Sequence, residues 1–217
     1  MGTYFNPNNK LFRKSLQSKI YIDKTGLIGF TNGLIDTEGR YMCVSRPRRF
    51  GKTMAMNMLA AYYSSGCESS EIFAGRKAAQ VTSYADHLNK HNVLRINMQY
   101  FLGITHTVDG LIEKLCEYLS KEIFAAYPEI NYLDKKNFFQ VLIDVYNYTD
   151  ILFVILIDEW DCLFREYKDD KKSQDKYLDF LRSWLKDQEY VGLVYMTGIL
   201  PIKKYGTHSA LNMFDEF

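Results

Sequence analysis

The chain has 217 residues, a formal net charge of +1 and a hydrophobic content of 47%. This length predicts one main domain with a sizeable core, and the balanced charge excludes a global electrostatic attraction to nucleic acid or anionic lipid. The four cysteines lie far apart, without a CxxC pair or a histidine at ligand spacing, so neither a zinc site nor a disulfide framework is predicted. No apolar segment reaches membrane-spanning length. We therefore expect a cytoplasmic protein with reduced thiols and no membrane contact.

Two β-rich runs, each followed by a helical pattern, occupy the first part of the chain. RYMCVSR (40–46) precedes a pattern rich in Ala, Met and Leu that begins at Gly51 and ends near Gly66. NVLRINM (92–98) precedes a helical pattern over 107–127, for which Thr107 is the expected N-cap. Each pair predicts a strand, a turn and a helix.

The second half of the chain repeats this alternation. A helix is predicted over 135–148, and ILFVILIDE (151–159) is then continuously apolar, as expected of a strand buried on both faces of a parallel sheet. A helix over 169–190 and a last strand, VGLVYMTG (191–198), follow. Strands that alternate with helices predict an α/β fold with a mainly parallel sheet covered by helices.

The predicted strands bring three segments to one edge of the sheet. Ligands of such sheets bind at the carboxyl ends of the strands, where 45–53, 158–161 and 197–198 are expected. The first segment, SRPRRFGKT, ends in the Gly-Lys-Thr of the phosphate-binding pattern G-x-x-x-x-G-K-S/T, although Arg46 takes the place of the first glycine. On its own this match is also compatible with a basic, solvated helix start.

The acidic end of the third strand decides between these readings. Asp158 and Glu159 follow the apolar run directly, as expected when an Asp holds Mg²⁺ and the next Glu orients or deprotonates water. Alone, they could be a core strand that runs into an acidic turn. Because the two motifs occur in the right order on separate strands, their combination predicts nucleotide binding.

Four strings resemble one known family, the AAA-ATPase-like domain proteins of the additional-strand P-loop NTPases, which often carry a C-terminal nuclease-like domain of the PD-(D/E)XK type. They are YIDKTGLI (21–28), SRPRRFGKT (45–53), VILIDEWD (154–161) and YMTGILPI (195–202). The family's loop usually reads close to R-P-R-R-F-G-K-S/T, so SRPRRFGKT looks like a divergent Walker A loop. The resemblance implies a P-loop NTPase-type three-layer α/β/α sandwich with ATP and Mg²⁺ as ligands.

The resemblance also implies roles for individual residues. Glu159 would activate water, Lys52 would contact the phosphates, and Thr197 would be a polar sensor. Thr53 and Asp158 would hold Mg²⁺ at the Walker A and Walker B motifs. The nucleotide-binding loop would comprise Arg48, Arg49, Phe50, Gly51, Lys52, Thr53 and Met54.

Two segments keep open alternatives. By resemblance, YIDKT lies near the adenine, whereas its residues alone indicate a short edge strand at Tyr21 and Ile22 followed by a helix cap. The arginines at 46, 48 and 49 could stabilise transferred charge, pair with Glu159 or Asp161, or be solvated.

The chain departs from the family at its end. Because GTHSALNMFDEF (206–217) resembles the stretch after the fourth strand, we expect 1–217 to be one ATPase domain, incomplete before a fifth strand and helical lid, with 1–39 near the nucleotide base. The related strand order 5-1-4-3-2 would then expose an apolar edge along YMCVS (41–45). The expected consequence is self-association, a partner domain at this edge, or cover by the chain's own termini.

Three functions follow from this sequence. The first is a Mg-dependent ATPase, a hydrolase that drives or gates a partner domain or a nucleic-acid process. The second is a nucleotide-binding switch without useful turnover. Direct nucleic-acid binding is weakly supported, because acids are interleaved with the basic residues and no known DNA-binding motif is present.

Overall fold

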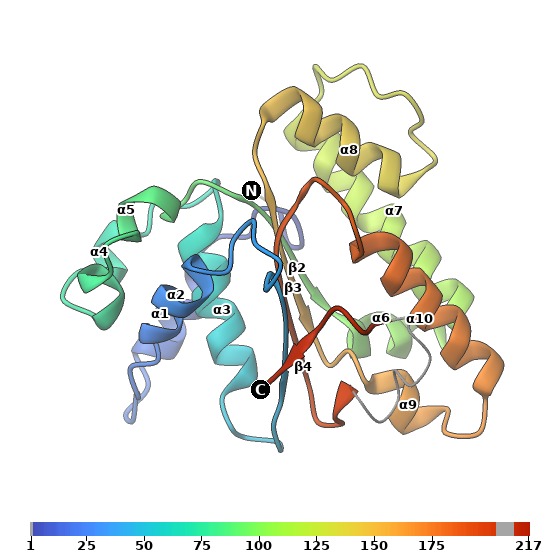
Figure 1. Cartoon of the computed structure of the whole chain (residues 1–217), viewed down its shortest axis with the longest axis horizontal. Helices are drawn as coiled ribbons and strands as arrows, with labels where there is room; N and C mark the ends of the chain where they lie inside the picture. The colour runs from blue at the N-terminus through green and yellow to red at the C-terminus, as the bar shows by residue number, and fades with distance from the viewer. Residues whose placement is uncertain (1, 203–210) are drawn as a thin grey trace.

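The computed structural model describes residues 2–202 and 211–217 and shows three layers, with a parallel sheet between two layers of helices (Figure 1). The strands are β1 (Tyr41–Ser45), β2 (Asn92–Asn97), β3 (Phe153–Asp158), β4 (Val191–Gly198) and β5 (Asp215–Glu216). Their order in the sheet is β2-β3-β4-β1-β5, and every pair is parallel. The predicted α/β/α class and the strand order are therefore confirmed.

The helices divide between the two faces of the sheet (Figure 1). One face carries α1 (Lys10–Leu16), α2 (Gly26–Asn32), α3 (Lys52–Tyr63), α4 (Ser70–Phe73), the 3-10 helix η1 (Lys77–Gln80) and α5 (Tyr84–His87). The other carries α6 (Met98–Thr105), α7 (Val108–Ala126), α8 (Phe138–Thr149), α9 (Cys162–Glu166) and α10 (Lys171–Leu185).

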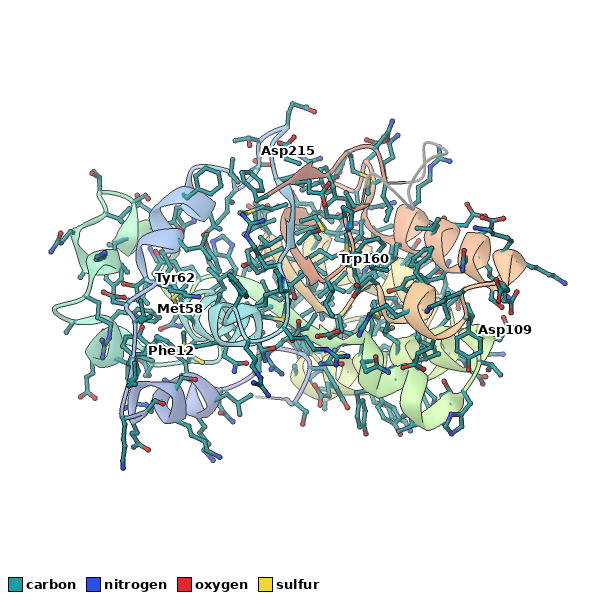
Figure 2. The ribbon with its side chains drawn as sticks, turned by 90° about the horizontal axis from the view of Figure 1, so that it is seen from below. Phe12, Met58, Tyr62, Asp109, Trp160 and Asp215 are labelled. Atoms are coloured by element: carbon teal, nitrogen blue, oxygen red, sulfur yellow. The ribbon has the colours of Figure 1, made fainter. Side chains whose placement is uncertain are left out.

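Alternation along the strands separates two hydrophobic cores. In β3, Phe153, Ile155 and Ile157 face the core under α7, α8 and α10, whereas Val154 and Leu156 face the core under α3. Side chains that alternate across a strand point to opposite faces of the sheet, so an unbroken apolar run fits a strand that is buried on both sides. Figure 2 shows Phe12, Met58 and Tyr62 gathered in the second core and Trp160 inside the first.

Helix α7 shows how the larger core is stabilised. Its Thr107 N-cap accepts a hydrogen bond from Gly110 N at 3.1 Å, as predicted, and its inward face includes Leu119, which is fully buried. Replacing Leu119 with Ala should lower the free energy of unfolding by about 2–5 kcal/mol, because a cavity replaces the lost side chain. Urea unfolding measures this loss. Leu133→Ala is the control, because Leu133 is 80% exposed and its truncation should change stability by less than about 0.5 kcal/mol.

The prediction of a missing fifth strand is wrong. The short strand β5 pairs with β1 through Met42 opposite Asp215 and Cys43 opposite Glu216. Phe217 extends this contact, because its N–H donates to Cys43 O at 2.9 Å and its carbonyl accepts from Ser45 N at 3.0 Å. The edge of β1 is therefore covered by the chain's own C-terminal residues, which removes the exposed edge that the sequence indicated.

The opposite edge of the sheet is also covered. Residues 4–6 run antiparallel to β2, where Asn6 N donates to Val93 O and Arg95 N donates to Tyr4 O, each at 2.8 Å. The Glu122 carboxylate on α7 holds this segment by accepting from the backbone N–H groups of residues 3, 4 and 5, again at 2.8 Å. The C-terminal residues thus pair with β1, and residues 4–6 pair with β2.

The edge strand indicated at Tyr21 and Ile22 is also wrong, because these residues form no strand. The Asp23 carboxylate instead accepts from Thr25 N at 2.9 Å just before α2, so the predicted helix start is confirmed. A local hydrogen bond from an Asp side chain to the backbone favours a turn over a strand, and this bond forms here.

The four cysteines are free thiols, as expected. Burial raises the pKa of Cys43, Cys116 and Cys162 to about 12, so these thiols stay protonated and unreactive at neutral pH. Across residues 2–202 and 211–217, no helix has the length and apolar character needed to cross a membrane.

Candidate functional site

The first residue of α3, Lys52, holds the loop between β1 and α3 in shape. Lys52 Nζ donates to Arg46 O at 2.6 Å and to Pro47 O at 3.0 Å, and the Lys52 side chain is 8% exposed. Gly51 caps α3 with φ of 78°, and Arg49 also has a left-handed φ of 70°. The loop therefore folds tightly over the first turn of α3, whose free N–H groups lie at the carboxyl edge of the sheet.

Gly51 meets two constraints at once. Its φ lies in the left-handed region, and a Cβ there would lie 2.8 Å from Lys24 Nζ, which donates to Phe50 O at 2.7 Å. Gly51→Ala should therefore lower the free energy of unfolding by about 1–2 kcal/mol through backbone strain. A further loss should follow because Lys24 must give up its hydrogen bond to Phe50.

Gly75→Ala is the matched control, because Gly75 has φ of 72° with nothing within 4 Å of an added Cβ. Chemical denaturation of both variants separates the backbone cost from the Lys24 contact. Equal losses would contradict a role for Lys24 in holding the loop.

A chain of side-chain hydrogen bonds joins the loop to the centre of the sheet. Thr53 Oγ1 donates to Asp158 Oδ2 at 2.8 Å, and Thr197 Oγ1 donates to Asp158 Oδ1 at 2.5 Å. Asp158 is 2% exposed and Thr197 is fully buried. The sequence motifs at 53, 158 and 197 thus meet around one carboxylate, as their placement at strand ends predicted.

Glu159 lies next to this carboxylate but points to a different partner. Its backbone has φ of 55°, and its N–H donates to Asp158 Oδ1 at 3.1 Å. Its carboxylate forms an ion pair with Arg165 on α9, and their side chains are 24% and 18% exposed. Solvent therefore reaches Glu159, whereas Asp158 is enclosed.

Asp161 is a buried structural link and not a solvent-facing acid. Its Oδ2 accepts from the backbone N–H groups of Ile199 and Leu200 at 2.9 and 2.8 Å, which fixes the segment after β4 to the end of β3. Arg165 Nε lies 3.5 Å from the same oxygen. One guanidinium is thus shared between the acids at 159 and 161.

The arginines of the loop lie at the surface, and their role in stabilising transferred charge stays a prediction. Arg46, Arg48 and Arg49 are exposed, and Arg46 Nη1 donates to its neighbour Ser45 O at 3.0 Å. Within the described residues, the ion pairs of both Glu159 and Asp161 are made by Arg165, so the pairing proposed for the loop arginines is wrong. Of the other predicted loop residues, Phe50 is 58% exposed, Thr53 is exposed and Met54 is half-buried.

A cavity of about 550 Å³ lies beside the loop, between α2, β1 and the C-terminal residues. Its walls include Leu27 and Phe30 from α2, Val44 from β1, and Phe217, whose ring meets Phe30 edge to face at 5.5 Å. Gly51 and Lys52 line the cavity where it opens to the loop. An apolar cavity with cationic groups at one end suits a ligand that carries a flat apolar part and an anionic part.

A second arginine contributes to the electrostatics of Asp158. Arg95 on β2 donates from Nε to Asn57 Oδ1 on α3 at 2.9 Å. Burial lowers the pKa of Arg95, and the negative charge of Asp158 acts in the opposite direction. Because an arginine guanidinium keeps its proton in proteins, Arg95 and Asp158 attract each other.

Sequence reasoning missed three contributors to this edge, namely Arg165, Arg95 and the cavity wall. Arg165 stands four residues after Asp161, the spacing that brings side chains together on a helix, but the five-residue α9 had no detectable periodicity. By resemblance, YIDKT lies near the adenine, and the structure places Lys24 of this string against Phe50 of the loop.

A five-stranded parallel sheet in this order defines a P-loop-type α/β/α protein, because a Gly-Lys-Thr loop opens α3 after β1 and a buried Asp ends β3, with β4 between the two strands. Residues 11–207 match the model of the family described as Predicted AAA-ATPase, AAA-ATPase_like, and the chain belongs to that family. It is thus a nucleotide-binding, ATPase-like module.

One relative of this chain is a longer protein. The chain is 27% identical over 205 residues to a protein of Azotobacter chroococcum mcd 1 described as an uncharacterized protein in the vnfD 5′ region. The match covers 90% of this chain and 37% of that relative, so the chain spans little more than a third of its length. No solved structure matches the chain.

Proposed function

We propose that this chain binds ATP with Mg²⁺ and hydrolyses it. The observation that carries the proposal is the contact of Thr53 with Asp158 at 2.8 Å, because it joins the phosphate-binding loop to the acidic end of β3. Lys52 and the N–H groups at the start of α3 lie on the same edge, where they favour bound phosphate. Family membership supports the same conclusion.

The residues present fit a magnesium ion. Mg²⁺ takes hard oxygen ligands and is usually bound through one or two protein groups together with water and substrate phosphates. Thr53 Oγ1 and Asp158 Oδ2 are two such oxygens in direct contact, and they would hold the ion. When bound, Mg²⁺ neutralises charge that develops on the phosphates.

The remaining residues have roles that follow from their positions. Lys52 would turn a free N–H toward the phosphates, since its ammonium has three donors and two are used by loop carbonyls. Glu159 would accept a proton from water as the water oxygen bonds to the γ-phosphorus and the bond to the β–γ bridging oxygen breaks, giving ADP and phosphate. Thr197 would keep Asp158 in place.

The adenine would occupy the cavity beside the loop. Its apolar wall from α2 belongs to residues 1–39, the segment that we expect to lie near the base, and β1 supplies a further wall. Lys24 and Lys52 line the end that faces the loop, toward which the phosphates would extend. The cavity volume of about 550 Å³ lies within the range of small-molecule sites.

Phe30→Ala should weaken ATP binding by about threefold to tenfold, because an aromatic contact with the base contributes roughly 0.5–1.5 kcal/mol. Affinity for inorganic triphosphate, which has no base, should not change. Titration calorimetry with both ligands makes the comparison. Tyr148→Ala is the control, since Tyr148 is 59% exposed on α8, on the opposite face of the sheet. Equal loss for both ligands would contradict a base in this cavity.

The proposed hydrolysis would drive or gate a further part of the protein or a partner. The relative is much longer than the region that this chain matches, which leaves room for a domain that responds to the nucleotide. Steady-state phosphate release with and without Mg²⁺ tests the activity itself. Mg-dependent release of ADP and phosphate supports the ATPase, and ATP binding without release would identify a nucleotide-binding switch.

A further inference from the structure

Arg165 connects the acids at the end of β3 to two other segments of the site. Its Nη2 forms the ion pair with Glu159 and also donates to Gln99 Oε1 on α6 at 3.3 Å. Its Nε faces Asp161 Oδ2 at 3.5 Å. The guanidinium therefore bridges the first turn of α6, the turn after β3 and the start of α9.

The position of Arg165 is fixed more firmly than that of an ordinary surface arginine. Asp161 is fully buried and bonded to the backbone after β4, so the carboxylate that faces Arg165 Nε has little freedom. The arginine side chain itself is 18% exposed. A planar guanidinium holds two acceptors in a set geometry, which a lysine ammonium cannot reproduce.

Among residues 2–202 and 211–217, Arg165 is the side-chain partner of the Glu159 carboxylate. Its backbone φ of 55° places the residue in a sharp turn, and the next residue is fixed because Trp160 N donates to Thr197 O at 3.1 Å. The backbone is thus set by the turn, and the orientation of the carboxylate is set by Arg165. A contact that aligns a proton acceptor affects the rate of the chemical step, because a small displacement of a reacting group lowers that rate strongly.

We propose that Arg165 is a positioning residue, which holds the Glu159 carboxylate in the orientation needed for water activation. The inference rests on the proposed ATPase function and adds a residue that none of the sequence motifs contains. Arg165 acts through Glu159 and does not itself contact ATP. Through Asp161, it also ties that orientation to the backbone at Ile199 and Leu200.

The test compares turnover and nucleotide affinity for Arg165→Ala, Arg165→Lys and the control Arg182→Ala, since Arg182 is exposed on α10. Arg165→Ala should lower kcat by about 10- to 100-fold. Its Kd for a non-hydrolysable ATP analogue should stay within about twofold, because Arg165 is not in the phosphate loop. Arg165→Lys, which keeps a cation near Glu159, should recover part of the rate.

The same substitutions in a Glu159→Gln background show whether Arg165 acts through Glu159. Arg165→Ala should then have no further effect on the residual rate, because the group that it positions is already gone. If Arg165→Ala does not fold, Arg165→Gln, which keeps a donor on a shorter side chain, takes its place in the cycle.

The experiments distinguish failure of the Arg165 inference from failure of the proposed ATPase function. If the wild-type chain hydrolyses ATP and Arg165→Ala has the same or a higher kcat, the inference is overturned and the proposed function stands. An equal loss of rate in the Glu159→Gln background also overturns it, because Arg165 then acts by another route. A wild-type chain that binds ATP without turnover overturns the proposed hydrolysis, and the role of Arg165 with it.

Discussion

Glu159→Gln should leave Mg-ATP binding intact and lower the rate of hydrolysis by about 10²- to 10⁴-fold, the usual contribution of a positioned general base. Gln keeps the size of the side chain and can accept a hydrogen bond from Arg165, but it cannot take a proton from water. The nucleotide affinity should be nearly unchanged, since Thr53, Asp158 and Lys52 are not altered. Single-turnover hydrolysis together with titration calorimetry measures the two effects separately.

Glu113→Gln is the matched control for this substitution, because Glu113 is an exposed acid on α7. It removes the same charge at a distance from the strand ends and should turn over like the wild type. A Glu159→Gln chain that keeps the wild-type rate would show that another group activates the water. A parallel loss of ATP binding would instead place Glu159 in the binding of the phosphates.

Lys52→Ala should weaken ATP binding by about 10- to 100-fold. A hydrogen bond to a charged group contributes roughly 1.5–3 kcal/mol, and each 1.4 kcal/mol corresponds to a factor of ten in affinity. The effect has two sources, because the substitution removes the ammonium from the phosphates and also its bonds to the carbonyls of Arg46 and Pro47. Titration calorimetry with ATP and Mg²⁺ measures the loss.

Lys90→Ala removes an exposed lysine outside this loop and should bind ATP like the wild type. A urea unfolding curve for Lys52→Ala establishes that the chain is folded when binding is measured. Wild-type affinity in the folded Lys52→Ala chain would mean that the loop at 45–53 is a basic turn and not a phosphate site.

The parts of the fold that the sequence predicted are those with strong local patterns. Strand β4 has the predicted bounds, and β3 is shorter than its apolar run by two residues at the start and one at the end. Helix α7 was recognisable because its apolar residues recur at helical spacing behind a threonine cap. Short elements such as α9 and β5 carry no periodicity, and tertiary contacts decide their structure.

In the candidate site, too, the residues that belong to local sequence patterns were predictable and the others were not. Thr53 and Asp158 belong to motifs whose place at strand ends follows from the α/β pattern, and the structure brings them into contact. Arg165 and Phe217 reach the same edge only through the packing of α9 and the pairing of β5 with β1. Phe217 is far from β1 in the sequence, and the five-residue α9 that carries Arg165 is too short to show a periodic pattern, so these residues required the structure.

The most direct test of the nucleotide site is a crystal structure of the Glu159→Gln chain grown with ATP and Mg²⁺. We expect the phosphates on the N–H groups of residues 49–53, the metal ion between the oxygens of Thr53 and Asp158, and the adenine in the cavity lined by Leu27 and Phe30. ATP bound at another surface of the chain, with this loop and cavity unchanged, would contradict the account.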